Sequence, residues 1–321
     1  MSEPASGSQM NEHDTTVAFL GLGNMGLPMA KNLVAAGYTV HGYDPVAKAA
    51  DAARQAGIPV AAGPAEAVAG AAVVITMLPS GRHVLDAYAP GAGIIGTVAD
   101  GTLLIDCSTI DVGDARAAHG LAVTAGLPAV DAPVSGGVVG ATAGTLTFMV
   151  GGGTDAVARA QPLLAQMGKR VVHCGDPGAG QAAKVCNNMI LAASMIAVGE
   201  AFVLAESLGL DHQALFDVVS TSSGQCWAVT ANCPVPGPVP TSPANRDFTG
   251  GFATTLMAKD LRLAAAAAEQ GNVEIALGRH ALAIYEELAA EVPDRDFSVV
   301  IDAVRRRSGT TGQAGLTGES A

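Results

Sequence analysis

The sequence has little positive charge. Its 321 residues include 17 Lys or Arg against 29 Asp or Glu, which gives a formal net charge of −12, and only five are lysines, at positions 31, 48, 169, 184 and 259. Binding nucleic acid or an anionic membrane as a main task needs a basic patch. We therefore expect neither a nucleic acid nor a membrane as the partner.

Charged residues as a whole are also scarce, at 14%, and aromatic residues make up 4%, whereas 49% of the chain is hydrophobic and 40 residues are glycine. Disordered chains have the opposite balance, with high charge and low hydrophobicity. A folded chain of this length suggests roughly two domains.

Cysteine is sparse and unpatterned. The five cysteines are odd in number, and none forms a Cys-x-x-Cys pair. This favours reduced thiols in a cytoplasmic protein, and we predict no metal site. Residues 1–14 are polar and acidic, without the basic start and apolar run of a targeting segment, so we expect a flexible arm. The longest apolar run, 189–205, contains Ser194 and Glu200, and we expect a buried core helix there rather than a membrane span.

The first half of the chain alternates short β-branched runs with alanine-rich segments, which predicts a doubly wound, mainly parallel sheet of the Rossmann type with helices on both faces. Two further runs, 145–150 and 171–174, flank a helix at 155–167 and are expected at the far edge of that sheet. The predicted strands are 16–22, 39–44, 73–78, 102–108 and 129–134, and the predicted helices between them are 25–36, 46–56, 82–88 and 112–124.

Strand patterns stop after Gly180, and the rest of the chain predicts an all-α domain with a long Pro- and Gly-rich loop at 233–252. Long loops inside compact domains are often functional. We divide the chain into the arm 1–14, a dinucleotide-binding domain 15–177, a helical substrate and oligomerisation domain 178–307 and a flexible tail 308–321. The predicted helices are 181–208, 211–221, 254–270, 274–290 and 297–306.

A glycine motif follows the first predicted strand. Residues 16–26 read TVAFLGLGNMG, in which Gly21, Gly23 and Gly26 have the spacing Gly-x-Gly-x-x-Gly. Such glycines allow a tight turn, approach of the backbone to a pyrophosphate, and close packing of helix on strand. Asp44, at the end of the next strand, is placed to accept the ribose hydroxyls and to repel a 2′-phosphate, which favours NAD over NADP. The alternative is a structural turn in which Asp44 caps the following helix.

Two loops follow the predicted strands at 73–78 and 102–108, and they read Met77-Leu78-Pro79-Ser80 and Asp106-Cys107-Ser108-Thr109. Ligands of doubly wound sheets bind at these strand ends. Ser80 and Asp111 also suit helix N-caps, and both interpretations can hold together.

A second glycine loop lies in the segment DAPVSGG, where Ser135, Gly136 and Gly137 follow a strand. Successive backbone N–H groups and a hydroxyl there suit a carboxylate. The same residues also suit a simple turn.

A lysine occurs near the start of the long apolar helix, in the segment GAGQAAKVCNNM. Lys184 and Asn188 are four residues apart and share a helix face. Oxidation of an alcohol needs a proton acceptor, and an amine serves when desolvation or the positive end of a helix favours its neutral form. The alternative is an ordinary lysine on a solvated face, and the same alternative applies to the pair Lys259 and Asp260.

Taken together, GLGNMG, DAPVSGG and GAGQAAKVCNNM resemble the β-hydroxyacid dehydrogenase family, and the resemblance runs from about residue 16 to residue 305. The segments SSGQCW (222–227), NCPVPGPVP (232–240) and GGFATTLMAKDL (250–261) resemble the branch of that family that acts on 3-hydroxyisobutyrate. The resemblance implies NAD-dependent oxidation of this small hydroxy acid to methylmalonate semialdehyde, a step of valine breakdown.

The resemblance also implies roles for individual residues. Lys184 would be the catalytic acid/base, and the family's helical domains would pair into homodimers or homotetramers. His83 stands where the branch often has Asn, so its expected contact with the cofactor departs from the pattern. The implied substrate-binding residues are Ser135, Gly136, Gly137 and Asn188, and the implied cofactor-binding residues are Gly21, Leu22, Gly23, Asn24, Met25, Gly26, Asp44, Leu78, Pro79, His83, Thr109 and Lys259.

Three alternatives share parts of this pattern. Other dehydrogenases and the semialdehyde or glyoxylate reductases of the family, which act on 3-hydroxypropionate, serine or tartronate semialdehyde, share all three core motifs. The reductases usually take NADPH, and Asp44 argues against that cofactor. Imine reductases typically replace the lysine that Lys184 retains, and a non-catalytic dinucleotide-binding module would not need the intact Lys184 and Ser-Gly-Gly loop.

Overall fold

The computed structural model describes residues 15–91 and 93–309 and divides into two compact units, with the boundary between Lys184 and Val185. This boundary lies inside one long helix, whereas the sequence placed it at 177/178, before that helix. The predicted arm 1–14 lies outside the described residues. So does the predicted tail from residue 310 onward, while Ser308 ends the last helix and Gly309 caps it in the left-handed conformation.

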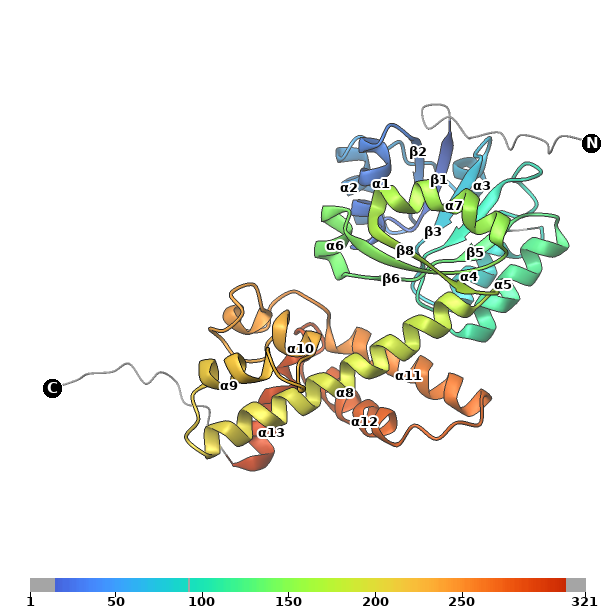
Figure 1. Ribbon diagram of the computed structural model, residues 1–321. Helices are drawn as coiled ribbons and strands as arrows, with labels where there is room; N and C mark the ends of the chain where they lie inside the picture. The colour runs from blue at the N-terminus through green and yellow to red at the C-terminus, as the bar shows by residue number, and fades with distance from the viewer. Residues whose placement is uncertain (1–14, 92, 310–321) are drawn as a thin grey trace, which may run out of the picture. The chain divides into compact units, whose positions relative to one another are not determined.

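The first unit is built on an eight-stranded sheet (Figure 1), with strand order β2-β1-β3-β4-β5-β7-β6 and β8 paired with β7. Strands β1 to β5 pair in parallel, so their carboxyl ends meet at one edge. The strands are β1 (Thr16–Leu20), β2 (Thr39–Tyr43), β3 (Val73–Thr76), β4 (Leu103–Asp106), β5 (Ala129–Asp131), β6 (Val134–Ser135), β7 (Leu146–Gly151) and β8 (Gly168–Gly175).

Helices cover both faces of this sheet, and the alternation of β1 shows why. Val17 and Phe19 belong to one apolar core, and Ala18 and Leu20 belong to the other. A strand whose alternate side chains are buried on opposite faces must have a layer on each side. This confirms the predicted Rossmann-type α/β fold. The helices are α1 (Gly26–Ala35), α2 (Ala47–Gln55), α3 (Pro64–Val68), α4 (Gly81–Tyr88), α5 (Val112–Thr124), α6 (Gly137–Ala143) and α7 (Thr154–Met167).

The two runs predicted at the far edge of the sheet lie there as β7 and β8, but the direction of β7 differs from that of a parallel sheet. β7 is antiparallel to β5 and β6 and parallel to β8. Direction depends on how the short connection through α6 returns the chain, which side-chain alternation does not encode. The five-residue α3 and the seven-residue α6 were also not predicted. The sequence of α6 (GVVGATA) consists mainly of small residues and has no apolar stripe.

The second unit is helical, as predicted. Strand pairing in its described residues is limited to isolated bridges between Thr249 and Arg295 and between Ala253 and Asp296. Its elements are α8 (Ala179–Ser207, which begins in the first unit), α9 (His212–Val219), α10 (Trp227–Thr230), the 3-10 turn η2 (Pro243–Arg246), α11 (Thr254–Gln270), α12 (Ala276–Glu291), the 3-10 turn η3 (Phe297–Val299) and α13 (Val300–Ser308).

α8 has the length and apolarity of a membrane span, a test that core helices also pass, and half of its most apolar window is buried within the protein. Ala192, Met195 and Phe202 lie in the core of the helical unit, beside residues of α11, α12 and α13. α8 therefore contributes to the core of this unit.

The Pro- and Gly-rich loop of the second unit is organised by one buried carboxylate. Asp296 accepts hydrogen bonds from the side chain of Asn232 (3.0 Å), from the backbone of Phe252 (2.7 Å) and from the hydroxyl of Ser298 (2.6 Å). Asp296 therefore holds the loop at both of its ends, near Asn232 and at Phe252.

The turn from β1 into α1 provides a test of the fold. A Cβ atom on Gly26 would lie 1.9 Å from the carbonyl oxygen of Gly21, whereas a Cβ atom on Gly23 would meet nothing within 4 Å. We expect Gly26→Ala to lower the free energy of unfolding by about 1–3 kcal/mol, the cost of overpacking, and Gly23→Ala to leave it nearly unchanged. Urea denaturation of both variants tests this, and equal stabilities would contradict it.

Candidate active site

The glycine loop at the end of β1 is held by the end of β2. The N–H of Gly21 donates to the carbonyl of Tyr43 (2.9 Å), and the N–H of Leu22 donates to Oδ2 of Asp44 (2.7 Å). Oδ1 of Asp44 accepts from the N–H of Val46 (2.8 Å), at the start of α2. Asp44 therefore fixes the entry to the next helix and also fixes the glycine loop, so the structural role of Asp44 is present whatever else it binds.

The same loop leaves an open backbone surface. Gly21 has a φ of +94°, and Gly23 and Asn24 are exposed. They precede α1, whose first N–H groups form the positive end of the helix. A dinucleotide pyrophosphate binds such a loop through backbone N–H groups. The residues present therefore fit the cofactor that the motif predicts, with Asp44 at the position expected for a ribose contact.

The two neighbouring strand-end loops are joined by a buried hydroxyl. Ser108 accepts a hydrogen bond from the N–H of Leu78 (2.8 Å) through its Oγ and donates to Oδ1 of Asp106 (2.6 Å). Thr76 also donates to Oδ1 of Asp106 (2.8 Å). This network places Leu78 and Thr109, both predicted cofactor contacts, on loops whose backbones are fixed to one another.

Asp106 is a functional candidate that the sequence did not single out. Its side chain is 4% exposed, and in the described part of the chain its Oδ2 has no hydrogen-bond partner. Burial raises the pKa of Asp106 to about 6, against the hydrogen bonds from Ser108 and Thr76 that lower it. Burial, together with the nearby Asp106 charge, also raises the pKa of Tyr88 above its usual range. An acidic residue inside a predicted strand was the available signal.

The predicted helix caps give one confirmation and one correction. Asp111 caps α5 by accepting from the N–H of Gly113 (2.7 Å). Ser80 occupies the cap position of α4 but makes no side-chain bond to the helix backbone. Its hydroxyl instead pairs with Nδ1 of the exposed His83 (2.7 Å). His83, one turn into α4, therefore lies at the same strand end as Pro79.

The second glycine loop has the backbone that its sequence requires. Ser135 ends β6, and Gly136 and Gly137 follow with φ values of +131° and +59°, which residues other than glycine rarely adopt. The next residues begin α6, so the loop is the entry to a helix. This geometry presents backbone N–H groups next to the half-exposed hydroxyl of Ser135.

The structure brings this second loop and the lysine of the third motif together. Nζ of Lys184 donates a hydrogen bond to the carbonyl of Val134 (2.9 Å), the residue before Ser135. Lys184 is 6% exposed, so it does not lie on a solvated helix face, and that alternative is ruled out. Residues fifty positions apart in the sequence therefore place an amine beside the Ser-Gly-Gly loop, within the first unit.

Asn188, one helical turn after Lys184, is held within the second unit. Its amide donates to Oδ2 of Asp260 (2.5 Å), and its Oδ1 accepts from the side chain of Asn187 (2.9 Å). Asn188 and Asp260 are both buried, so Asp260 is not part of a solvated face. Its neighbour Lys259 is half-exposed on α11. The sequence missed Asp260, since nothing in a helical Lys-Asp pair shows which of the two is buried.

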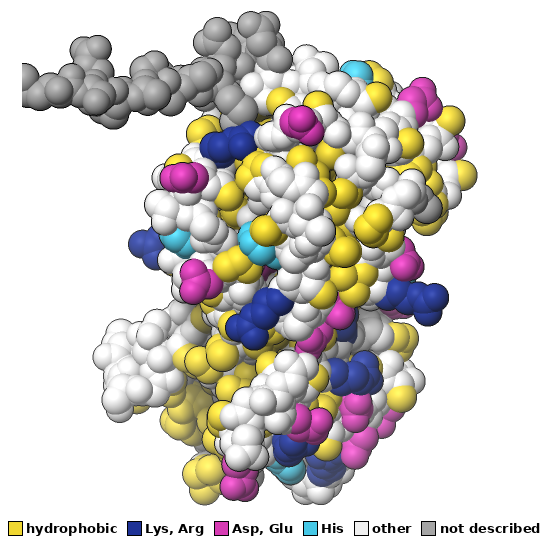
Figure 2. Space-filling model, turned by 90° about the vertical axis from the view of Figure 1, so that its right-hand side faces the viewer, with side chains coloured by type: hydrophobic (Ala, Val, Ile, Leu, Met, Phe, Trp, Pro, Cys, Tyr) yellow, Lys and Arg dark blue, Asp and Glu magenta, His cyan; other side chains and the backbone are white. Residues whose placement is uncertain are grey.

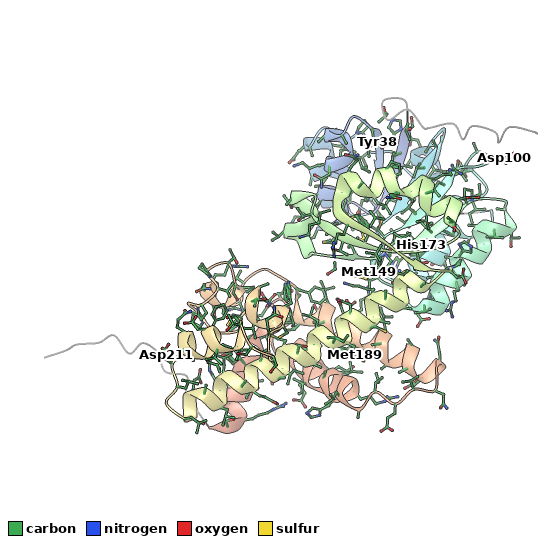
Figure 3. The ribbon with its side chains drawn as sticks, viewed as in Figure 1. Tyr38, Asp100, Met149, His173, Met189 and Asp211 are labelled. Carbon is green, nitrogen blue, oxygen red and sulfur yellow. The ribbon has the colours of Figure 1, made fainter. Side chains whose placement is uncertain are left out.

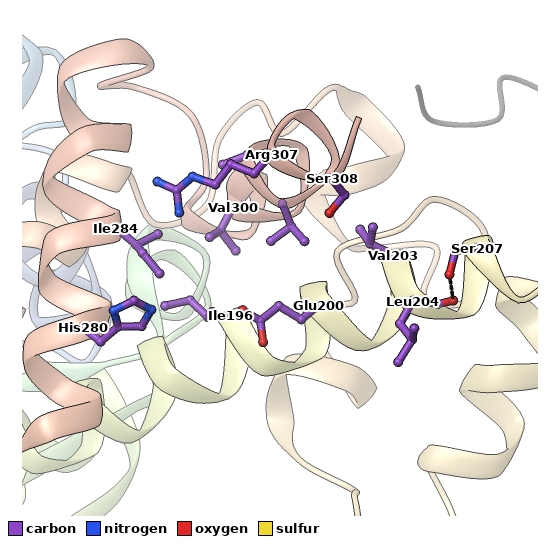
Figure 4. Close-up of a pocket in the computed structure, with 12 residues that line it drawn as sticks. Ile196, Glu200, Val203, Leu204, Ser207, His280, Ile284, Val300, Arg307 and Ser308 are labelled. Carbon is purple, nitrogen blue, oxygen red and sulfur yellow. Dashed lines mark hydrogen bonds between the residues drawn. The ribbon is translucent and has the colours of Figure 1, made fainter. Parts of the chain in front are cut away.

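One hollow of the structure lies away from these residues. It is a groove of about 540 Å³ in the helical unit, between α8, α12 and α13 (Figure 4), and Glu200, Leu204, His280 and Arg307 are among its lining residues. It contains none of the predicted site residues. Across residues 15–91 and 93–309, no group of three His, Cys, Asp or Glu side chains is arranged to hold a metal ion.

Figure 2 shows one face of the molecule, on which Lys and Arg side chains are dispersed and several lie beside acidic ones. The Lys184 amine, by contrast, is buried.

A doubly wound sheet with a glycine loop after its first strand and an acid after its second defines a dinucleotide-binding protein, and a buried lysine beside a second glycine loop is suited to an oxidoreductase. Comparison with known proteins agrees. Residues 16–175 match the NAD-binding domain of 6-phosphogluconate dehydrogenase, and residues 178–304 match the family described as NAD-binding of NADP-dependent 3-hydroxyisobutyrate dehydrogenase.

Curated relatives match along nearly their whole length. A probable 3-hydroxyisobutyrate dehydrogenase of Mycobacterium tuberculosis is 55% identical over 294 residues, 92% of this chain and 99% of the relative. An NAD-dependent L-serine dehydrogenase of Pseudomonas aeruginosa is 47% identical over 285 residues, 88% of this chain and 96% of the relative. The solved structure of the M. tuberculosis 3-hydroxyisobutyrate dehydrogenase with L-serine matches with a TM-score of 0.87 over 91% of this chain and 99% of that one, at 55% identity.

The chain therefore belongs to the 3-hydroxyisobutyrate dehydrogenase family, whose members are NAD-dependent oxidoreductases acting on the CH–OH group of hydroxy acids.

The buried carboxyl of Asp106 gives a pH prediction. Its pKa of about 6 in the folded protein exceeds the usual 3.9, so the folded state holds this proton more tightly than the unfolded chain. The raised pKa of Asp106 therefore adds about 3 kcal/mol to the free energy of unfolding below about pH 4. This contribution is lost as the pH rises to about 6. We expect the stability of wild type relative to Asp106→Asn to fall by that amount across this range.

Urea denaturation between pH 4 and 8 measures this difference. Asp100→Asn, which removes an exposed carboxylate of the same unit (Figure 3), is the matched control. A difference between wild type and Asp106→Asn that does not change with pH would contradict the assignment of a raised pKa.

Proposed function

We propose that this protein oxidises 3-hydroxyisobutyrate to methylmalonate semialdehyde with NAD, as a step of valine breakdown, and that Lys184 is the general acid/base. The observation that carries the proposal is the position of the Lys184 amine, buried and 2.9 Å from the Val134 carbonyl, directly beside Ser135. The high identity to proteins named 3-hydroxyisobutyrate dehydrogenase supports the choice of substrate.

The reaction removes a hydride from the hydroxyl-bearing carbon and a proton from its oxygen. NAD, when bound, supplies the hydride acceptor. The Lys184 amine takes the hydroxyl proton in its neutral form and returns a proton in the reverse reaction. Its hydrogen bond to Val134 fixes the direction of Nζ, so that little of the barrier is spent on orienting the base.

The carboxylate of the substrate is assigned to the loop of Ser135, Gly136 and Gly137. A carboxylate is bound well by backbone N–H groups of consecutive residues and by a hydroxyl, and the left-handed glycines provide such a backbone. In a 3-hydroxy acid the carboxylate and the hydroxyl are separated by two carbons. A carboxylate bound at Ser135 thus places the substrate hydroxyl near the amine of Lys184, which is bonded to Val134, the residue before this loop. Asn188, held by Asp260, is assigned to the substrate hydroxyl.

The cofactor is assigned to the first unit. The glycine loop with Gly23 and Asn24 exposed takes the pyrophosphate, Asp44 takes the ribose, and the loops that carry Leu78, Pro79 and Thr109 contact the rest. His83 is exposed beside Ser80 and donates to a ribose or a phosphate. Lys259 is assigned as a further cofactor contact. Asp44 favours NAD over NADP, since a carboxylate repels a 2′-phosphate.

L-serine is the second candidate substrate. It has the same 3-hydroxy acid frame as 3-hydroxyisobutyrate, with an amine in place of the methyl group. One relative is named an L-serine dehydrogenase, and the solved M. tuberculosis structure was determined with L-serine. Both substrates use the same acid/base and the same carboxylate loop, so the choice between them depends on the contacts of the group at carbon 2.

Replacement of Lys184 tests the mechanism. We expect Lys184→Ala to lower kcat by about 10²- to 10⁴-fold, the usual contribution of a general acid/base, while NAD binding persists. Lys169→Ala removes an exposed lysine of the same unit and is the matched control. Near-normal turnover of Lys184→Ala would rule the role out.

A substrate panel tests the reaction itself. Steady-state kcat/KM for 3-hydroxyisobutyrate, L-serine, 3-hydroxypropionate and glycerate, each with NAD and NADP, is expected to be highest for 3-hydroxyisobutyrate with NAD. A higher value for L-serine would assign the protein to its serine-oxidising relatives, and a preference for NADP would contradict the role of Asp44.

We also propose that the protein is a homodimer or homotetramer formed through its helical unit. Ile190 and Leu204 of α8 and Leu208, the residue after its end, are exposed, and Leu204 lines the groove of Figure 4. Large apolar side chains exposed beside a groove of a folded unit are typical of an interface. The five cysteines are free thiols in the structure, and a reducing cytoplasm is the proposed location.

A charge in that groove tests the assembly. We expect Leu204→Glu to shift the mass measured by light scattering after gel filtration toward that of one 31.9 kDa chain, since an unpaired buried charge destabilises an interface. Val123→Glu, at an exposed apolar position of the first unit, should leave the mass unchanged. An unchanged mass for Leu204→Glu would place the interface elsewhere.

A further inference from the structure

Gln181 is a fully buried polar side chain on the first turn of α8. Its Nε2 donates to the carbonyl of Ser108 (2.7 Å), and its Oε1 accepts from the N–H of Ile110 (3.1 Å). The two bonded residues lie on either side of Thr109. One carboxamide therefore holds the backbone of the loop that follows β4, by bonding to one of its carbonyls and to one of its N–H groups as a neighbouring strand would.

The start of α8 is itself fixed to the sheet. The carboxylate of Asp131 on β5 accepts from the N–H of Gly178 (2.7 Å) and from the N–H of Gln181 (2.9 Å). A Cβ atom on Gly180 would lie 2.3 Å from the carbonyl of Met149, which Figure 3 labels on β7. The helix backbone thus lies against two strands, so the Gln181 side chain has a fixed origin.

The bonds continue from Gln181 to the other cofactor loop. Ser108, whose carbonyl accepts from Gln181, also accepts through its hydroxyl from the N–H of Leu78 (2.8 Å). Lys184 is three residues after Gln181 on the same helix and is bonded to Val134 (2.9 Å). All of these residues belong to the first unit.

We infer that Gln181 is a positioning residue that holds the cofactor loops of Leu78 and Thr109 in register with the Lys184 amine. The inference rests on the proposed function. Hydride and proton leave neighbouring atoms of one substrate, so the hydride acceptor and the base must be fixed relative to each other. A misplacement of about 1 Å can lower the rate about 100-fold.

The chemistry of the carboxamide makes this role specific. A donor and an acceptor on one planar group match the carbonyl of Ser108 and the N–H of Ile110. A methionine side chain is about as long as a glutamine side chain, but it has neither the N–H donor nor the carbonyl acceptor. A glutamate keeps the acceptor for Ile110 but donates to Ser108 only when it is protonated.

Gln181→Met is the first test. We expect kcat to fall about 10- to 100-fold while the KM for NAD changes much less. With substrate deuterated at the hydroxyl-bearing carbon, the isotope effect on kcat should rise, because hydride transfer becomes the slow step. Gln166→Met, on α7, removes a partly exposed glutamine of the same unit and is the matched control. A kcat within about twofold of wild type, with an unchanged isotope effect, would overturn the inference.

Gln181→Glu is the second test and decides the matter if the methionine variant does not fold. The ratio of its kcat to that of wild type should rise as pH is lowered from 9 to 6, since a protonated glutamate again donates to Ser108. Asp106, Asp131 and Lys184 are common to both proteins, so their titration largely cancels in the ratio. A ratio that does not change with pH would overturn the inference.

The two proposals fail in different ways. If Lys184→Ala retains turnover, the acid/base assignment is wrong, whatever Gln181 does. If Lys184→Ala loses turnover while a folded Gln181→Met keeps the wild-type kcat and isotope effect, the mechanism stands and the positioning role is wrong.

Discussion

The hydrogen bonds between the Asp131 carboxylate and the backbone at the start of α8 are the constraint on which the site depends. A helix N-terminus has N–H groups without partners in the helix, and they need acceptors when they are buried. Here a residue of the sheet supplies them, so the direction of the helix is set by a strand. The position of Lys184 then follows from helix geometry. Its amine contacts Val134, directly before the second glycine loop.

Two buried carboxylates at adjacent strand ends accept the hydrogen bonds that hold these loops and the start of α8. Asp106 and Asp131 face each other in the register of β4 and β5, and each mainly binds backbone and hydroxyl donors rather than cations. Burial raises the pKa of both. Desolvated carboxylates lower stability unless they are well bonded, so their presence is better explained by the loops that they hold than by stability.

The sequence was sufficient for the fold class and for the loops that follow the strands. Alternating apolar strands indicated the sheet, and the three glycine-containing motifs indicated the loops at its edge. The antiparallel direction of β7, the burial of Asp260 and the role of Gln181 were not predictable in this way. Each depends on which segments meet in space, and a glutamine or an aspartate in a helix has the same local pattern whether it contacts water or a distant carbonyl.

The chain has a single tryptophan, Trp227, which begins α10 in the helical unit and is 54% exposed. Fluorescence excited where only tryptophan absorbs therefore comes from one position, and the sheet unit contributes none of it. An unfolding curve recorded by this emission follows the helical unit alone, whereas backbone circular dichroism records both. A difference between the two curves would measure how independently the two units unfold.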